Sequence, residues 1–406
     1  MGGISFIIEN MIEMVYNYLR NEFVYAKRRE IILMDCKTFA DKGFVSLGNL
    51  FRISKIMKKA ANGEDITVGF MGGSITRGAQ STIHENCYAY LVYSWWVNKF
   101  PKSNITYVNC GVGGTTSQFG VARVEDDLLR FDPDFVITEF SVNDKDEDMY
   151  METYEGLIRK ILMHKTQPAV MILNNVRYNT GVNAQRIHNR IGTAYNLSMV
   201  SIKDSLYAEV ELGRVKVSDI TEDFLHPNDL GHKIVSEIVN NSLEKIYEKV
   251  LTGDIFKEYI IPKETVTQNR FIKSIRYNNK NCSPESKDFI VDHREQTAVY
   301  DKFKNGWIAK HAGASIHFTI PCKSIAIQYC KSPRRNAPLA KAVIDGDPQH
   351  TYSIDASNSS TKGDNLFIQN LLFENECKLH EITIAVDKID ESIGDEFYLA
   401  SIIVTV

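Results

Sequence analysis

The first residue able to do chemistry is a serine in a glycine-rich turn, Gly72-Gly73-Ser74-Ile75-Thr76, which directly follows an apolar run. A serine hydroxyl is a useful nucleophile only when a neighbouring base removes its proton and hydrogen-bond donors stabilise the resulting oxyanion. The two glycines let the backbone turn sharply and let a substrate approach closely. Because position 76 is threonine and no Gly-Lys-Ser/Thr follows, the turn is neither an α/β-hydrolase nucleophile elbow nor a phosphate loop.

Three later polar turns contain residues that could serve this serine. The turn 109–116 is glycine-rich, and a glycine within it can offer a backbone N–H to an oxyanion. The turn 139–144 contains Asn143, whose side-chain amide is a second donor. Asp223 and His226 lie three residues apart, so the carboxylate can orient an imidazole that takes the serine proton. Each of these turns, taken alone, is also compatible with a structural role, the last one as a helix cap.

The elements that must position these turns alternate between short apolar runs and longer amphipathic stretches. The runs are Ile66–Met71, Ile105–Cys110, Phe135–Phe140, Ala169–Leu173 and Met199–Ile202. The helical patterns between and after them cover 87–100, 117–130, 149–165, 183–196 and 229–250. Alternation of this kind predicts a parallel sheet with helices on both faces, in which ligands bind at the carboxyl ends of the strands. We therefore expect a three-layer α/β/α domain.

The hydrophobic pattern of the sequence changes after about residue 253, where long helical patterns give way to short alternating segments separated by turn residues. The predicted strands are Ser315–Ile320, Ser324–Tyr329, Lys341–Ile344, Glu381–Val386 and Tyr398–Val406. This pattern is typical of an antiparallel β-sandwich or jelly roll. The sequence thus predicts an N-terminal helical extension at 1–44, a catalytic domain at 45–252 and an all-β domain at 253–406, with the boundary between 250 and 275.

The four polar turns, in this order and after predicted strands, resemble the conserved blocks of the SGNH (GDSL-like) hydrolases. On that resemblance Ser74 is the nucleophile, Asp223 and His226 complete the triad, and Ser74, Gly114 and Asn143 form the oxyanion hole. The usual Gly-Asp-Ser-Leu reads Gly-Gly-Ser-Ile here. The missing aspartate is not a triad member, so the resemblance still implies an active esterase, one that needs neither a metal nor an organic cofactor.

The second domain directs the choice of substrate. A β-sandwich after the catalytic domain resembles the carbohydrate-binding module of two-domain acetylesterases, which implies acetylated mannan or xylan oligosaccharides as substrates. Trp307 could stack on a sugar ring, with burial in the sandwich core as the alternative. Other readings are a lysophospholipase or thioesterase with the same triad, acetyl transfer between sugars, and a carbohydrate-binding protein whose triad is vestigial.

Composition excludes other classes of function. The net charge of -4 and the absence of a long basic run argue against nucleic acid as a partner. No segment is long enough to span a membrane. The amphipathic pattern between Ile4 and Leu19 is interrupted by Glu9 and Glu13 and follows no basic residue, unlike a signal peptide. With seven scattered cysteines and no Cys-x-x-Cys, we expect a cytoplasmic protein. The amphipathic pattern leaves a homo-oligomer open.

Overall fold

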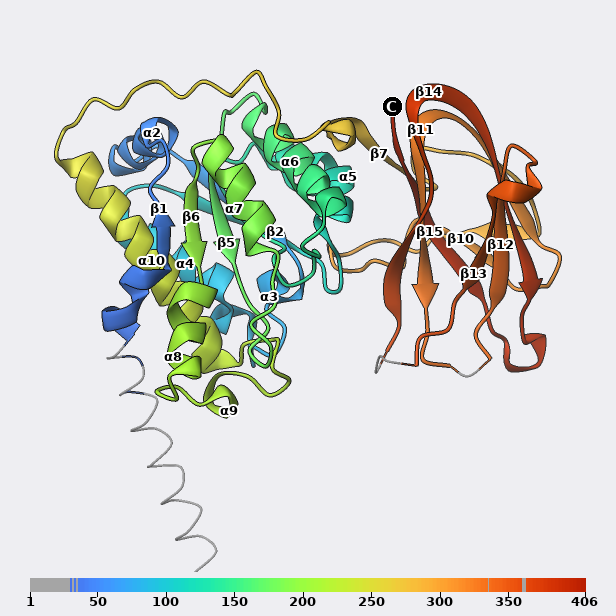
Figure 1. Cartoon of the computed structure of the whole chain (residues 1–406), viewed down its shortest axis with the longest axis horizontal. Coiled ribbons are helices and arrows are strands. Elements are labelled where there is room, and N and C mark those ends of the chain that lie inside the picture. The colour runs from blue at the N-terminus through green and yellow to red at the C-terminus, as the bar shows by residue number, and fades with distance from the viewer. Residues whose placement is uncertain (1–29, 31–32, 34–35, 335, 360–362) are drawn as a thin grey trace, which may run out of the picture.

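The computed structural model describes residues 30, 33, 36–334, 336–359 and 363–406, which form two domains (Figure 1). The predicted amphipathic helix between Ile4 and Leu19 lies outside the described residues. Cys36, Phe39 and Ala40 are buried in the core of the first domain, so its packed structure begins before residue 45.

The first domain is built on a six-stranded sheet with the order β1-β6-β5-β4-β2-β3. Its strands are β1 (Phe44–Ser46), β2 (Ile66–Gly72), β3 (Ile105–Gly111), β4 (Phe135–Glu139), β5 (Ala169–Asn174) and β6 (Ser198–Ser201). Strands β2 to β6 pair in parallel, which confirms the predicted sheet. The edge strand β1 pairs antiparallel with β6 and was not predicted, because three residues are too few to display an alternating pattern.

Helices cover both faces of this sheet, as the alternation predicted. One face packs against α2 (Phe51–Ala61), α4 (Tyr88–Lys99) and α10 (Asp229–Leu251). The other packs against α5 (Ser117–Asp127), α6 (Asp148–Leu162) and α7 (Gln185–Ala194). Because successive strand residues point to opposite faces, Phe70 of β2 enters the first core and Met71 enters the second. The buried strands are therefore mainly apolar, and the polar residues of the predicted site follow their carboxyl ends.

The second domain is antiparallel, with the strand order β13-β12-β14-β11-β15-β10-β9, while β7 pairs with β15 and β8 with β11. The strands are β7 (Ser274–Tyr277), β8 (Glu285–Lys287), β9 (Phe289–Val291), β10 (Trp307–Ala309), β11 (Ser315–Lys331), β12 (Leu339–Ile344), β13 (Thr351–Asp355), β14 (Asn365–Lys388) and β15 (Phe397–Thr405). The all-β prediction is confirmed, but the two strands predicted within 315–329 are one strand, β11. Register shifts near Cys322 and Ile325 interrupt its alternation and explain the error.

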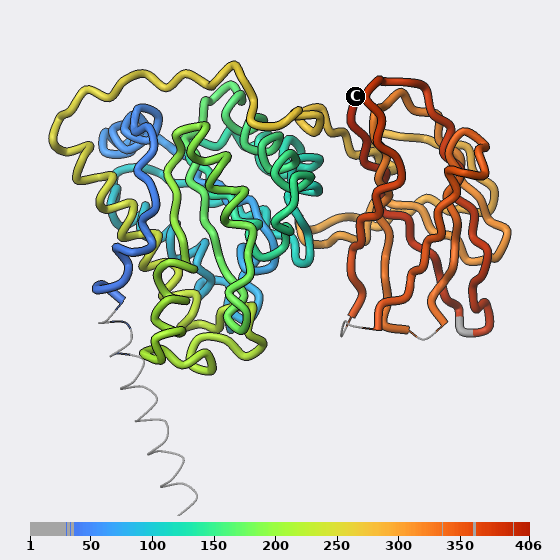
Figure 2. The backbone as a smooth tube through the Cα atoms, viewed as in Figure 1, coloured from blue at the N-terminus to red at the C-terminus, as the bar shows by residue number. Residues whose placement is uncertain are grey.

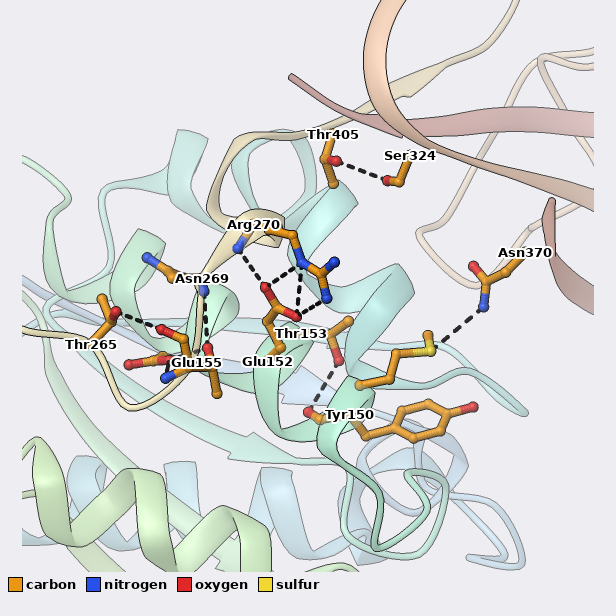
Figure 3. Close-up of polar contacts among 12 residues, drawn as sticks. Tyr150, Glu152, Thr153, Glu155, Thr265, Asn269, Arg270, Ser324, Asn370 and Thr405 are labelled. Atoms are coloured by element: carbon orange, nitrogen blue, oxygen red, sulfur yellow. Dashed lines mark hydrogen bonds and ion pairs between the residues drawn. The ribbon is translucent and has the colours of Figure 1, made fainter. Parts of the chain in front are cut away.

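A long linker joins the domains and is bound to α6. It leaves α10, crosses the first domain and reaches β7 (Figure 1). The buried Glu155 carboxylate accepts hydrogen bonds from the backbone of Val266 (2.7 Å) and Thr267 (2.8 Å). The buried Glu152 pairs with Arg270 at 2.8 Å (Figure 3). The linker is thus fixed to the first domain almost up to the start of the second.

The two domains also share a small apolar core close to the glycine-rich turn 109–116. Val112 and Phe119 of the first domain pack with Leu366, Tyr398 and Ile403 of the second. The segment between β9 and β10 extends from the β domain toward the first domain (Figure 2). The β domain therefore lies against the loops that follow the parallel strands.

Candidate active site

Ser74 is the first residue of the short helix α3 (Ser74–Arg77), directly after β2. It is 9% exposed, and its backbone N–H, like the other first N–H groups of a helix, has no partner in the described part of the chain. The two preceding positions must be glycine, because neighbouring atoms leave no room for a Cβ at either of them. A Cβ on Gly72 would lie 2.1 Å from the Thr76 hydroxyl oxygen, and one on Gly73 would lie 2.4 Å from the Asn143 amide oxygen.

The imidazole of His226 lies between Ser74 and Asp223. Its Nε2 is 2.8 Å from the Ser74 Oγ, and its Nδ1 is 2.7 Å from the Asp223 Oδ2. With Nδ1–H bound to the carboxylate, Nε2 is left as the acceptor for the serine proton. The structure thus brings together three residues that lie up to 152 positions apart in the chain.

A tight turn holds the aspartate under the histidine. The second carboxylate oxygen of Asp223 accepts the backbone N–H groups of Leu225 (3.0 Å) and His226 (2.8 Å). Phe224 closes this turn in the left-handed conformation (φ 63°), and its carbonyl accepts the Tyr178 N–H at 2.8 Å. A non-glycine residue adopts this conformation only where surrounding contacts hold it. The carboxylate is therefore oriented before any substrate arrives.

The protonation of Asp223 suits this role. Partial burial acts to raise the pKa of its carboxyl group, but the hydrogen bonds from the His226 side chain and from the backbone outweigh it, so the pKa lies below its usual value. Asp223 is consequently an anion at neutral pH. An anion in this position stabilises the imidazolium that forms when His226 takes a proton.

Two glycines and an asparagine from neighbouring loops surround the serine. Gly113 lies against it, since a Cβ on Gly113 would be 3.6 Å from the Ser74 Cβ. Gly114 is left-handed (φ 71°), and no partner for its N–H occurs among the described residues. Asn143 sits in the turn after β4, with its amide oxygen buried beside Gly73 and unpaired in the part of the chain described. The predicted oxyanion donors therefore come from three loops at one edge of the sheet.

A buried polar layer beneath the serine was not predicted from the sequence. The Thr76 hydroxyl lies 2.8 Å from the Tyr88 hydroxyl and donates to the Glu139 carboxylate at 3.1 Å. Complete burial raises the pKa of Glu139 to about 7. The only sequence signal was the polar residue itself at the end of an apolar strand.

The β domain contributes residues to the rim of this site. The Lys302 ammonium donates to the Gly113 carbonyl at 3.3 Å, and the Arg77 guanidinium lies over the Tyr300 ring at 4.9 Å. Burial lowers the pKa of Lys302, and the positive charge of Arg77 lowers it further. Asn365 is close to Gly114, because a Cβ on that glycine would be 3.7 Å from the Asn365 Oδ1. Tyr300 is 53% exposed and presents an aromatic surface next to the oxyanion loop.

The prediction that Trp307 stacks on a sugar ring is wrong. The residue is 2% exposed and belongs to the β-domain core, where its ring meets Phe318 edge-to-face at 5.3 Å. A single tryptophan in a strand does not by its type distinguish core from surface, and here the core reading holds.

No group of three or more His, Cys, Asp or Glu side chains able to hold a metal ion occurs within the described ranges. Over the same residues, no helix has the length and apolar character needed to cross a bilayer. None of the seven cysteines, all of which the structure describes, is in a disulfide.

Known proteins resemble this chain in both domains. Residues 70–234 match the GDSL-like Lipase/Acylhydrolase family. A solved two-domain esterase (CEX) active on acetylated mannans, co-crystallized with mannopentaose, is 42% identical, with a TM-score of 0.85 over 90% of this chain and 97% of the esterase. A second structure of a two-domain esterase (CEX) active on acetylated mannans, also 42% identical, gives a TM-score of 0.86 over 90% of this chain and 98% of the esterase. An acetylxylan esterase from Geobacillus stearothermophilus is 27% identical in an alignment of 158 positions, covering 34% of this chain and 71% of the esterase.

Proposed function

The chain belongs to the GDSL-like lipase/acylhydrolase family, and we propose that it removes O-acetyl groups from acetylated oligosaccharides of the mannan type. The observation that carries the chemistry is the Asp223–His226–Ser74 chain, with contacts of 2.7 and 2.8 Å. The choice of substrate rests on the likeness across both domains to an esterase active on acetylated mannans. The acetylxylan esterase in the comparison makes acetylated xylan the second substrate to test.

In the proposed reaction the Ser74 Oγ attacks the acetyl carbonyl carbon while His226 takes the hydroxyl proton. The carbonyl oxygen becomes an anion held by the Ser74 and Gly114 N–H groups and the Asn143 amide. His226 then gives its proton to the leaving sugar oxygen, and the acetyl group remains on Ser74. A water molecule, deprotonated by His226, attacks this ester, and His226 returns the proton to the Ser74 Oγ as acetate leaves.

The β domain supports an oligosaccharide substrate because it borders the reacting serine on one side. Tyr300 offers an exposed ring, while Lys302 and Asn365 place a cation and an amide next to the turn that contains Gly114. Sugars bind to surfaces that combine an aromatic face with hydrogen-bonding groups, whereas a lipid chain needs a continuous apolar cleft. We therefore place the sugar chain between the two domains.

The test is acetate release from acetylated mannan and xylan oligosaccharides, beside 4-nitrophenyl acetate and 4-nitrophenyl octanoate. We expect the wild type to deacetylate mannan oligosaccharides and Ser74→Ala to lose this activity. Ser94→Ala is the matched control, because its hydroxyl only donates to the Tyr90 carbonyl within α4. Turnover of octanoate alone would replace the proposal with a lipid or thioester substrate. Sugar binding without hydrolysis would favour a carbohydrate-binding protein.

A further inference from the structure

Asp144, the residue after Asn143, links the two loops that supply the oxyanion donors. Its side chain is fully buried, and one carboxylate oxygen accepts the Ser117 backbone N–H at 2.8 Å. Ser117 begins helix α5 three residues after Gly114. A carboxylate at this end of a helix is stabilised by the unpaired N–H groups there. One side chain thus joins the loop that contains Gly114 to the loop that contains Asn143.

His188 of α7 holds the other oxygen of this carboxylate. Its Nε2 is 3.0 Å from the Asp144 Oδ2, and its side chain is fully buried. The ring stacks on Tyr154 at 3.7 Å with an interplanar angle of 12°. Its Nδ1 is buried without a partner in the part of the chain that the structure describes. Burying an imidazole is costly unless it is hydrogen-bonded, so the contact that justifies a histidine here is the one to Asp144.

We propose that Asp144 and His188 are positioning residues that set the geometry of the oxyanion hole. This inference rests on the proposed esterase function and adds to it a second aspartate–histidine pair that never meets the substrate. Oxyanion donors act only when they lie 2.7–3.1 Å from the place where the charge develops. The Asp144 carboxylate fixes the separation of the two loops, and the His188 Nε2–H fixes the carboxylate.

The test compares two substitutions of His188 that differ in one hydrogen bond. His188→Leu removes the donor to Asp144, whereas His188→Gln can return an N–H near the position of Nε2. Three quantities are measured: kcat and KM for 4-nitrophenyl acetate, and the rate of inactivation by a 4-nitrophenyl alkylphosphonate. The phosphoryl oxygen of the phosphonate bound to serine occupies the oxyanion hole, so that rate reports on the donors.

We expect His188→Leu to lower kcat and the inactivation rate together, by about 10- to 100-fold, with KM unchanged, because a displacement of the order of 1 Å costs up to about 100-fold. His188→Gln should recover most of the loss. Asn143→Ala sets the upper reference, about 100- to 1000-fold for the loss of one donor. The double variant His188→Leu/Asn143→Ala should lower kcat by less than the product of the two single fold-losses, because both substitutions act on the same oxyanion hole.

His380→Leu is the matched control. The His380 Nδ1 binds Asp345 at 2.8 Å in the β domain with a side chain that is 3% exposed, so its loss is a comparable structural disturbance. The inference would be overturned if His188→Leu and His380→Leu lost the same melting temperature while His188→Leu kept the wild-type kcat and inactivation rate. If His188→Leu does not fold, Asp144→Asn takes its place with the same expected sign.

The proposed function can fail separately. A wild type that neither hydrolyses the aryl ester nor reacts with the phosphonate would overturn the esterase, and the positioning role with it. A wild type that does both, while His188→Leu behaves like His380→Leu, would overturn the positioning role alone.

Discussion

Two aspartate–histidine pairs lie at the same edge of the sheet and differ in exposure and in what the second histidine nitrogen contacts. In the Asp223–His226 pair the side chains are 44% and 22% exposed, and the free nitrogen of His226 reaches the Ser74 hydroxyl. In the Asp144–His188 pair both are fully buried, and the free nitrogen of His188 has no partner among the described residues. The first pair can pass a proton to a substrate, while the second can only hold backbone in place.

This difference shows that residue types and distances alone do not identify a catalytic pair. The Nδ1–Oδ2 distance in the first pair is 2.7 Å and the Nε2–Oδ2 distance in the second is 3.0 Å, so both lie within hydrogen-bonding range. The two pairs differ in the group that the second imidazole nitrogen contacts and in their exposure to water.

The largest effect is expected from replacing the aspartate of each pair by asparagine. Asp223→Asn should lower kcat for 4-nitrophenyl acetate by about 10,000-fold, because the amide favours the wrong tautomer of His226. Asp144→Asn should cost only about 10-fold, since the amide oxygen can still accept the Ser117 N–H and no proton passes through this pair. Steady-state kinetics of both variants measures the ratio. Equal losses would mean that the two pairs are not functionally distinct.

The difference between the pairs also explains what the sequence could predict. Asp223 and His226 are three residues apart after a predicted sheet, so one turn of backbone was enough to expect their contact. Asp144 and His188 are 44 residues apart, and they meet because the start of α7 packs beside the turn after β4, where the Ala184 N–H donates to the Ser141 carbonyl at 2.7 Å. Local spacing is visible in a sequence, whereas contacts between elements depend on side-chain packing.

The strands of the two domains differ in how clearly the sequence displays them. The five parallel strands were predicted because each is an apolar run ended by a glycine or a polar residue, as in β2 before Gly73. The β-domain strands were harder, since the irregular pairing of β11 breaks its alternation. The sequence left Trp307 between a core position and a sugar platform, because its residue type fits both, and only its burial in the structure decides for the core. The cytoplasmic location stays a prediction, because no feature of the structure tests it.

A smaller effect is expected at the rim, where a substrate contact lies outside both pairs. Tyr300→Ala should lower kcat/KM for acetylated mannan oligosaccharides by about 10-fold, because the exposed ring no longer packs on a sugar. Hydrolysis of 4-nitrophenyl acetate should stay at the wild-type rate, since that ester is too small to reach the β domain. Tyr300→Phe, which keeps the ring, is the control. If Tyr300→Ala lowered kcat/KM for both substrates, Tyr300 would act in the chemical step and not only in binding the sugar at the rim.

The smallest change is expected in stability alone, at a buried carboxyl that has no histidine. Glu139 has a pKa raised by burial from its ordinary value of 4.5 to about 7, so the folded protein binds a proton that the unfolded chain has released between these values. The free energy of unfolding should therefore fall as the pH rises from 4.5 to 7 and level off above 7. The full change for a fully buried group is about 3 kcal/mol.

Glu139→Gln is neutral in both the folded and the unfolded state. Between pH 4.5 and 7 the free energy of unfolding of the wild type should therefore fall relative to that of the variant. Urea unfolding at several pH values measures the difference, with Glu64→Gln, at an exposed carboxyl, as the control. Burial raises the pKa of Glu139, which accepts a hydrogen bond from the Thr76 hydroxyl, whereas the Asp144 carboxyl contacts the His188 imidazole and the first N–H of α5. Parallel curves of the free energy of unfolding against pH for the wild type and Glu139→Gln would mean that burial does not raise the pKa of Glu139. The contrast between Glu139 and Asp144 would then disappear.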